Sequence, residues 1–353
     1  MSHLILAINP GSTSTKIGLF KDEEVVFTES IEHKREELQA FPDLPAQKHF
    51  RLDFVLKALK DRGYKPSDLS AIVGRGGLLP PIEAGGYKVN EKMKDWVTKG
   101  LGGIHASNLG SLLADLVAQE AGCDAYIYDA VSAGILPEIA AITGFPEINR
   151  KSLSHVLNSR AQSIQYAKKI GKNFEELNLI IAHLGGGASL SAYEKGKMID
   201  SVGDDIGPFS PERAGGAPLL DFVDFAFEHG LQKNELKRRI RGNGGIVAHL
   251  GTTDVRIVEE MIKDGDKKAE SVLLAMCYNI SKAIGSLSTA LKGKVDAVII
   301  TGGIAKSELV TDYISEGVAF LAPVVIMPGE YELEALAAGC LRIITGEEAA
   351  REL

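Results

Sequence analysis

The sequence is poor in cysteine, and its three cysteines do not form a recognisable site. Cys123, Cys277 and Cys340 share no metal-ligand spacing, and each lies in an apolar stretch. Isolated cysteines in apolar surroundings are typical of reduced thiols in an intracellular protein. We therefore expect core thiols without a catalytic role, and a cytoplasmic location.

The sequence also lacks long hydrophobic runs and a targeting signal. No apolar run approaches the roughly 20 residues that a membrane-spanning helix needs. The apolar N-terminal run has no basic residues before it and stops at Asn9-Pro10, too early for a signal peptide. These absences predict a protein with no membrane partner.

Positive charge is in the minority. The chain has 39 Lys and Arg residues against 47 Asp and Glu residues, which gives a formal net charge of −8. A broad surface for the phosphate backbone of nucleic acids or for acidic lipids requires the opposite balance. The sequence thus predicts no nucleic-acid partner, and any anion site has to be local.

Two common nucleotide-binding motifs are missing. The sequence has neither the Walker A pattern G-x-x-x-x-G-K-[ST] nor the pattern G-x-G-x-x-G. Their absence argues against P-loop nucleotidases and against the dinucleotide-binding fold.

What the sequence does contain is an alternation of short β-rich runs and amphipathic helices, which predicts an α/β protein. A length of 353 residues predicts two domains. We expect one helix over 109–117, with Ser107 as its cap and Gly122 at its end, and a second helix over 272–291. We expect one strand over 126–128, which would present Asp129 at its end, and a second strand over 295–300. The amphipathic segment 152–169 is expected to join the halves.

One sequence pattern occurs twice. Residues 4–20 read LILAINPGSTSTKIGLF, and residues 179–193 read LIIAHLGGGASLSAY. Each is an apolar strand, a turn of glycine and small residues, and a second β-prone run. A single glycine-rich hairpin is usually only a tight turn, but two in register indicate a duplicated domain. Such a protein would hold the phosphates of a nucleotide between two turns rich in backbone N–H groups.

The same segments resemble signatures of the acetate/butyrate kinase family, within the acetate and sugar kinase/heat-shock protein/actin superfamily. Asn9-Pro-Gly-Ser-Thr-Ser-Thr-Lys16 is similar to the first signature, His183-Leu-Gly-Gly-Gly-Ala-Ser189 to the second, and Thr301-Gly-Gly-Ile304 to the adenosine-binding turn. The resemblance covers essentially the whole chain. The chain is shorter than typical acetate kinases and has Gly186 where they carry Asn, which places it nearer the butyrate side of the family.

The resemblance implies a duplicated actin-like (ribonuclease H-like) fold of two domains with a nucleotide cleft between them. The first domain would comprise 1–155, rejoined by a C-terminal helix at about 333–353, and the second 156–332. It further implies a homodimer or a larger homo-oligomer.

The implied activity is reversible phosphoryl transfer from ATP to a short-chain carboxylate such as butyrate or isobutyrate, giving acyl phosphate and ADP, with Mg²⁺. A carboxylate is already ionised and needs no general base, so catalysis consists of alignment and charge neutralisation. The alternatives are acetate, propionate or branched-chain acids as substrate, a sugar kinase with Asp129 as base, and an actin-like ATPase that is not a kinase.

The resemblance also assigns roles to residues. Arg75 and Arg213 would hold the carboxylate and the phosphoryl group in flight, and His155 and His183 would donate hydrogen bonds to that phosphoryl group. Asp129 would position Mg²⁺ through water. Glu332 resembles a second acidic residue, although Glu330 is an alternative for that position.

The remaining expected site residues bind the nucleotide or the acid. Phosphate-binding residues are expected in the two turns, and adenosine-binding residues in the third signature: Asn9, Ser12, Ser14, Lys16, Gly185, Gly186, Gly187, Gly302, Gly303 and Ile304. Ser307 is expected to cap the next helix. His105 and Gly77 are placed in the substrate pocket, because Gly76-Gly77 stands where acetate kinases have bulkier residues and would leave room for a propyl group.

Overall fold

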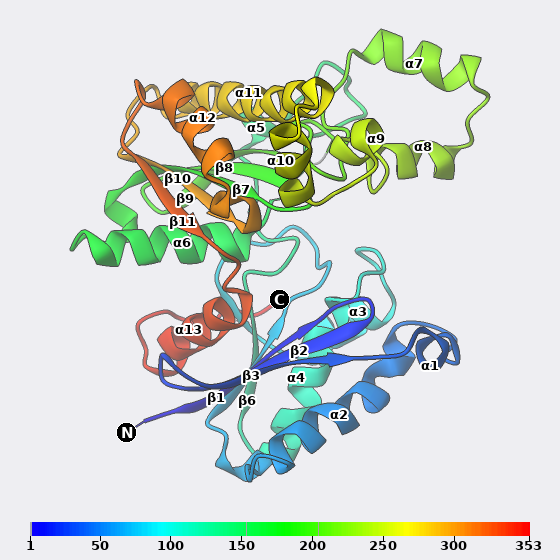
Figure 1. Ribbon diagram of the computed structural model, residues 1–353. Coiled ribbons are helices and arrows are strands. Elements are labelled where there is room, and N and C mark those ends of the chain that lie inside the picture. The colour runs from blue at the N-terminus through cyan, green and yellow to red at the C-terminus, as the bar shows by residue number, and fades with distance from the viewer. Residues whose placement is uncertain (1, 153, 204) are drawn as a thin grey trace. The chain divides into compact units, whose positions relative to one another are not determined.

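The computed structural model describes residues 2–152, 154–203 and 205–353, which divide into two compact units (Figure 1). The first unit runs to Ile135 and includes Tyr331–Leu353, and the second is Leu136–Glu330. The C-terminal helix therefore belongs to the same unit as the N-terminal strands. The domain limits expected from the resemblance, 1–155 and 156–332, stay a prediction.

The first unit is a six-stranded sheet in the order β3-β2-β1-β4-β6-β5. Its strands are β1 (Leu4–Pro10), β2 (Ser14–Lys21), β3 (Glu24–Glu32), β4 (Ala71–Arg75), β5 (Gly86–Lys88) and β6 (Asp124–Tyr128). The first three strands form an antiparallel meander, and β4 and β6 lie parallel to β1. Its helices are α1 (Arg35–Gln39), α2 (Lys48–Lys60), α3 (Glu91–Thr98), α4 (Asn108–Ala121) and α13 (Glu332–Ile344).

The central strands of this sheet are covered on both faces. Consecutive residues from Ile5 to Ile8 are all fully buried, as are Ala71, Ile72 and Val73. Figure 1 shows α13 on one side of the sheet and α2 with α4 on the other. A strand that is buried on both faces requires an unbroken apolar run, which is the pattern that the sequence has here.

The second unit is a five-stranded sheet in the order β11-β10-β7-β8-β9. Its strands are β7 (Asn178–Leu184), β8 (Ala188–Glu194), β9 (Lys197–Gly203), β10 (Ala297–Gly302) and β11 (Val324–Pro328). Its helices are α5 (Glu138–Ala141), α6 (Val156–Lys169), α7 (Leu219–Glu228), α8 (Lys233–Ile240), α9 (Ile246–Leu250), α10 (Val255–Lys263), α11 (Lys267–Ala290) and α12 (Glu308–Val318). In Figure 1, α11 and α12 lie on one side of this sheet and α6 on the other.

Alternate residues of β7 pack into two separate cores. Ile180 and Ala182 join the core that contains α11 and α12. Leu179 and Ile181 join the core that contains Ala167 of α6. The period-two alternation of a strand thus divides one apolar run between two layers of helices.

The two sheets repeat one design. In each, an antiparallel meander of three strands is followed by two strands parallel to its first strand. The register between the second and third strands shifts at Leu19/Phe20 in one meander and at Ala192/Tyr193 in the other. The duplication predicted from the repeated sequence pattern is confirmed.

Most of the elements predicted from the sequence are present. Helix α4 ends at Gly122, whose φ of 72° is favourable only for glycine, and β6 leads directly into Asp129. The helix predicted over 272–291 begins earlier, at Lys267, behind the capping carboxylate of Asp266. The predicted Ser107 cap is wrong, because no hydrogen bond joins its side chain to the start of α4.

The cysteines are all free thiols. Burial raises the pKa of Cys277 to about 12 and that of the half-buried Cys123 to about 11. Thiols with such pKa values are poor nucleophiles near neutral pH. In the described part of the chain, no helix combines the length and apolar character required to cross a membrane.

Helix α4 packs on β4 through a contact between two glycines. A Cβ atom on Gly74 would overlap the carbonyl oxygen of Gly110, and one on Gly110 would overlap the carbonyl oxygen of Arg75. Neither neighbour can move aside, because both are backbone atoms. This close approach fixes the position of Arg75, the residue that follows Gly74.

We therefore expect Gly74→Ala to lower the free energy of unfolding of the first unit by about 1–3 kcal/mol, the usual cost of overpacking. Urea unfolding followed by the fluorescence of Trp96, the sole tryptophan, measures this unit. The wild-type protein is the reference. A midpoint for Gly74→Ala equal to that of the wild-type protein would contradict the packing argument.

Candidate active site

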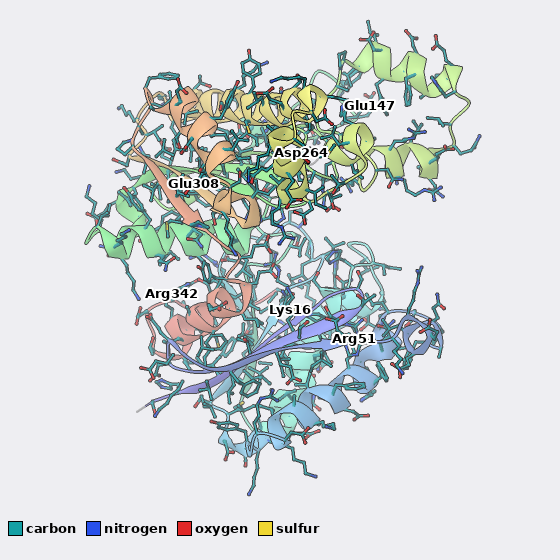
Figure 2. The ribbon with its side chains drawn as sticks, in the orientation of Figure 1. Lys16, Arg51, Glu147, Asp264, Glu308 and Arg342 are labelled. Carbon is teal, nitrogen blue, oxygen red and sulfur yellow. The ribbon has the colours of Figure 1, made fainter. Side chains whose placement is uncertain are left out.

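The first turn, residues 11–13, joins β1 to β2. The backbone N–H of Gly11 donates to the carbonyl oxygen of Ser14 at 2.8 Å, and the side chains of Ser12 and Thr13 are exposed. Lys16 is paired with Asn9 in the strand register, so both side chains lie on one face of the sheet. Lys16, which is labelled in Figure 2, is exposed, and no ion pair of its ammonium occurs within the described ranges.

A buried polar layer lies beneath this turn. His33, which is 5% exposed, places Nε2 at 2.8 Å from the hydroxyl of Thr15 and packs against the rings of Phe50 and Phe54. Burial, and then the nearby charge of Arg51, lower the pKa of His33. The imidazole is therefore neutral near pH 7.

The carboxyl ends of the parallel strands bring three of the predicted residues to one edge of the first sheet. Asn9, Arg75 and Asp129 stand at or directly after the ends of β1, β4 and β6. A guanidinium nitrogen of Arg75 donates to the backbone oxygen of Asp129 at 2.7 Å. The amide nitrogen of Asn9 donates to Oε2 of Glu332 at 2.5 Å.

Arg75 is the electrostatic centre of this group. Its side chain is buried, and burial lowers its pKa while the carboxylates of Glu332 and Asp129 act in the opposite direction. Partial burial and the charge of Arg75 lower the pKa of His105, whose Nδ1 lies 2.6 Å from the hydroxyl of Ser107. The first unit thus gathers Asn9 and four further predicted residues: Arg75, His105, Asp129 and Glu332.

The backbone of Asp129 has an unusual conformation. Its φ is +42°, which is uncommon for any residue other than glycine. Its Oδ1 accepts the backbone N–H of Gly85 at 2.7 Å. Strained residues of this kind persist where the surrounding structure holds them, and they concentrate at functional sites.

Gly77 is small for a reason that the sequence did not reveal. A Cβ atom there would lie 2.6 Å from the Cα atom of Asn108. The side chain of Asn108 accepts from the N–H of Leu78 and donates to the oxygen of Gly103, both at 2.9 Å. A valine at 77 would disrupt this junction, so its effect on substrate preference would not test the pocket. The pocket role of Gly77 stays a prediction.

The predicted histidines of the second unit stack on each other. The rings of His155 and His183 have centroids 4.1 Å apart. Nδ1 of His183 lies 3.1 Å from Oδ1 of Asn158, and Nδ1 of His155 lies 2.8 Å from the hydroxyl of Ser189. The other ring nitrogen of His183, Nε2, lies 3.5 Å from Oε1 of Glu330.

The second turn, residues 185–187, consists of glycines, and two side chains lie against it. A Cβ atom on Gly186 would lie 2.6 Å from Oε1 of Glu212, and one on Gly187 would lie 2.9 Å from Nε of Arg213. The backbone oxygen of Gly186 accepts from the hydroxyl of Ser210 at 2.8 Å and from the N–H of Glu212 at 3.1 Å. Arg213 is thereby placed beside the second turn.

The third signature lies next to the second turn. Gly302 has a φ of +92°, and a Cβ atom there would overlap the carbonyl oxygen of Leu184, the residue before the turn. Gly303 has open space around it. Ser307 accepts from the N–H of Val310 and caps α12, as predicted.

The structure separates the two acidic residues that the sequence could not distinguish. Glu330 pairs with His183, and its Oε1 would lie 3.2 Å from a Cβ atom on Gly185. Glu332 pairs with Asn9 at the start of α13. Glu330 therefore lies beside the second turn, whereas Glu332 contacts the end of β1 in the first unit.

No cluster of three or more metal-binding His, Cys, Asp or Glu side chains occurs in the part of the chain that the structure describes. Asp129 and Glu332 are nevertheless oxygen donors that both act on Arg75. Mg²⁺ keeps several of its waters and binds through one or two carboxylates. The donor set fits a water-mediated magnesium site better than a fully protein-enclosed one.

Sequence reasoning missed Arg51, Asn158, Ser189 and Glu212. Arg51 left a readable signal, because it occupies the helical face that also carries Val55 and Leu59, both buried. A charged residue at a core position usually has a specific polar partner. The partners of Asn158, Ser189 and Glu212 come from remote segments, and their own neighbours in the sequence do not indicate them.

Comparison with known proteins gives a full-length relationship. Residues 154–325 match the model of the Acetokinase family. The chain is 44% identical to Butyrate kinase 2 of Clostridium acetobutylicum, over 100% of this chain and 99% of the relative. It is 45% identical to Butyrate kinase 1 of the same organism, over 99% of each chain. The chain belongs to the acetokinase family.

A solved structure from the acetokinase family agrees with the fold. Acetate kinase from Porphyromonas gingivalis aligns with a TM-score of 0.81 at 18% identity, over 97% of this chain and 100% of the other. The predicted fold class and the predicted family are therefore confirmed. The roles of individual residues are not tested by these comparisons.

The neutral His33 gives the first unit a defined pH response. Its folded-state pKa lies below the usual 6.5, so below that pH the unfolded chain binds the proton more readily than the folded chain. We expect the free energy of unfolding to fall as pH decreases from 7.5 to 5.5, at about 1.4 kcal/mol per unit of pKa difference.

Urea unfolding followed by Trp96 fluorescence across this pH range measures the response. His33→Gln is expected to reduce the slope, and His49→Gln, which removes an exposed histidine, is the control for the substitution. Identical slopes for His33→Gln and the wild-type protein would contradict the assignment.

Proposed function

We propose that this protein transfers a phosphoryl group reversibly between ATP and butyrate, giving butyryl phosphate and ADP. The observation that carries the proposal is the relationship to two butyrate kinases at 44% and 45% identity over nearly the full length of each chain. The side chains give further support, because the first unit carries Arg75 and Lys16 and the second carries Arg213 and two stacked histidines, all suited to phosphoryl and carboxyl oxygens.

The reaction needs charge neutralisation rather than a general base. Butyrate is ionised at neutral pH, and it has to approach a polyphosphate of the same charge. Arg75 would bind the butyrate carboxylate with its planar fork, and Arg213 would stabilise the phosphoryl group in flight. Lys16, which has no competing ion pair within the described chain, would serve as a point charge for phosphate.

The histidines would act as oriented donors. Nδ1 of His183 lies 3.1 Å from the side chain of Asn158 and its ring stacks on that of His155, so its Nε2 is held in one direction. A ring fixed in this way loses little conformational entropy when it binds a phosphoryl oxygen. Asn158 thus acts through His183, as a positioning residue.

Nucleotide phosphates would lie against the turn residues Ser12 and Ser14 and the glycines 185–187. Adenosine would lie along Gly302, Gly303 and Ile304, where the open space at Gly303 allows a ligand to approach the backbone. Asp129 and Glu332 would hold Mg²⁺ through water, and the ion would neutralise phosphate charge. A cytoplasmic location and a homo-oligomeric assembly remain predictions.

Acyl-hydroxamate formation from ATP, Mg²⁺, hydroxylamine and a panel of acids tests the activity. We expect product with acetate, propionate, butyrate and isobutyrate, with the highest kcat/KM for a four-carbon acid. Each methylene buried in the pocket contributes about 0.8 kcal/mol. Preference for acetate would contradict the chain length, and ATP hydrolysis without hydroxamate would favour an actin-like ATPase.

Arg75→Lys tests the carboxylate fork. Lysine keeps the charge but loses the planar pair of donors, so we expect kcat/KM for butyrate to fall about 100- to 1000-fold, equivalent to about 2.7–4 kcal/mol. Steady-state hydroxamate assays measure the change, and the urea midpoint from Trp96 fluorescence controls for folding. Undiminished kcat/KM in a folded variant would remove Arg75 from the site.

A further inference from the structure

Arg51 is a fully buried cation in the first unit. It lies on α2, is 0% exposed, and extends toward the β1–β2 hairpin (Figure 2). In the described part of the chain, no carboxylate pairs with it. Burial lowers its pKa to about 10, so the guanidinium remains charged at neutral pH. A buried charge without a counter-ion is costly and requires an explanation.

All of its hydrogen bonds go to neutral acceptors, and three of the five acceptors are backbone oxygens of residues 11–14. Nη1 donates to the backbone oxygens of Gly11 at 2.9 Å and Ser14 at 2.8 Å, and Nη2 donates to that of Ser12 at 3.1 Å. Nη1 also reaches the hydroxyl of Thr15 at 3.2 Å. Nε and Nη2 donate to Oε1 of Gln47 at 3.2 and 3.0 Å, which fixes the plane of the guanidinium.

These bonds occupy the carbonyl acceptors of the turn and leave backbone N–H donors available. The one remaining carbonyl, that of Thr13, accepts the N–H of His33 at 2.8 Å, so every carbonyl from residue 11 to 14 is bonded. The backbone N–H groups of Ser12 and Thr13, in contrast, have no partner among the described residues. A turn whose acceptors are occupied and whose donors are free is suited to an anion.

We propose that Arg51 is a positioning residue that holds the carbonyl oxygens of residues 11–14 inward, so that the turn presents its N–H groups and hydroxyls to a phosphoryl group. The identification of the anion as a phosphoryl group of the nucleotide rests on the proposed function. The positive charge of Arg51 behind the turn adds to the attraction without contacting the ligand.

The test compares Arg51→Lys with Arg62→Lys. Lysine has the charge of arginine but only three donors on one nitrogen, so it cannot hold three carbonyls and Gln47 together. Arg62 lies just after the C-terminal end of α2 and donates to the carbonyl oxygen of Ala58 at 3.1 Å. It makes none of the hydrogen bonds to the first turn described above. We expect Arg51→Lys to weaken binding of Mg-ADP about tenfold or more, and Arg62→Lys to change it less than twofold.

Calorimetric titration with Mg-ADP measures binding without catalysis, and hydroxamate assays give KM for ATP and for butyrate. A positioning role predicts that KM for ATP rises about tenfold while KM for butyrate changes less than twofold. A general loss of structure would change both. Gln47→Met is the second variant, because it keeps Arg51 but frees the guanidinium plane, and we expect a severalfold rise in KM for ATP.

The outcomes separate the two proposals. Unchanged Mg-ADP binding in a folded Arg51→Lys variant overturns the role of Arg51 and leaves the kinase proposal standing. If Arg51→Lys does not fold, unchanged binding in Gln47→Met overturns it equally. Selective loss of binding in a protein that forms no hydroxamate supports Arg51 and overturns the kinase. A wild-type protein that does not bind Mg-ADP overturns both.

Discussion

The functional design of each unit depends on one constraint: the turn between its first two strands must satisfy its carbonyl oxygens from within the protein. In the first unit the guanidinium of Arg51 and the N–H of His33 do so. In the second unit the Ser210 hydroxyl and the Glu212 N–H bind the carbonyl of Gly186. If these oxygens turned outward, they would repel any anion that approached the turn.

Both units have the same strand order, but different side chains bond the carbonyl oxygens of the two turns. The first turn has small hydroxyl residues and is bonded from behind by a helix. The second turn has three glycines, and the side chains of Glu212 and Arg213 lie against Gly186 and Gly187. A shared backbone design therefore supports two chemically different surfaces.

The electrostatics of the site agree with a reaction between two anions. Its cations differ in surroundings: Lys16 is exposed, whereas Arg75 is buried beside Asp129 and Glu332. Both carboxylates offset part of the cost of burying Arg75, and carboxylate oxygens are the kind of ligand that Mg²⁺ binds. A buried guanidinium with fixed partners is better oriented toward a carboxylate than a free surface arginine.

The sequence by itself determined the α/β class and the duplicated hairpins, because strand periodicity and glycine turns are local signals. It also indicated that Arg75 and Asp129 follow apolar strands, which is where the structure has them. It also predicted the family, which full-length relatives confirm. Only the tertiary structure decided what depends on contacts between remote segments: Arg51 beneath the first turn, Asn158 against His183, Asn108 against Gly77, Glu330 beside the second turn, and Glu332 against Asn9. Local sequence patterns do not encode which side chain from another element fills a given space, and packing settles that choice.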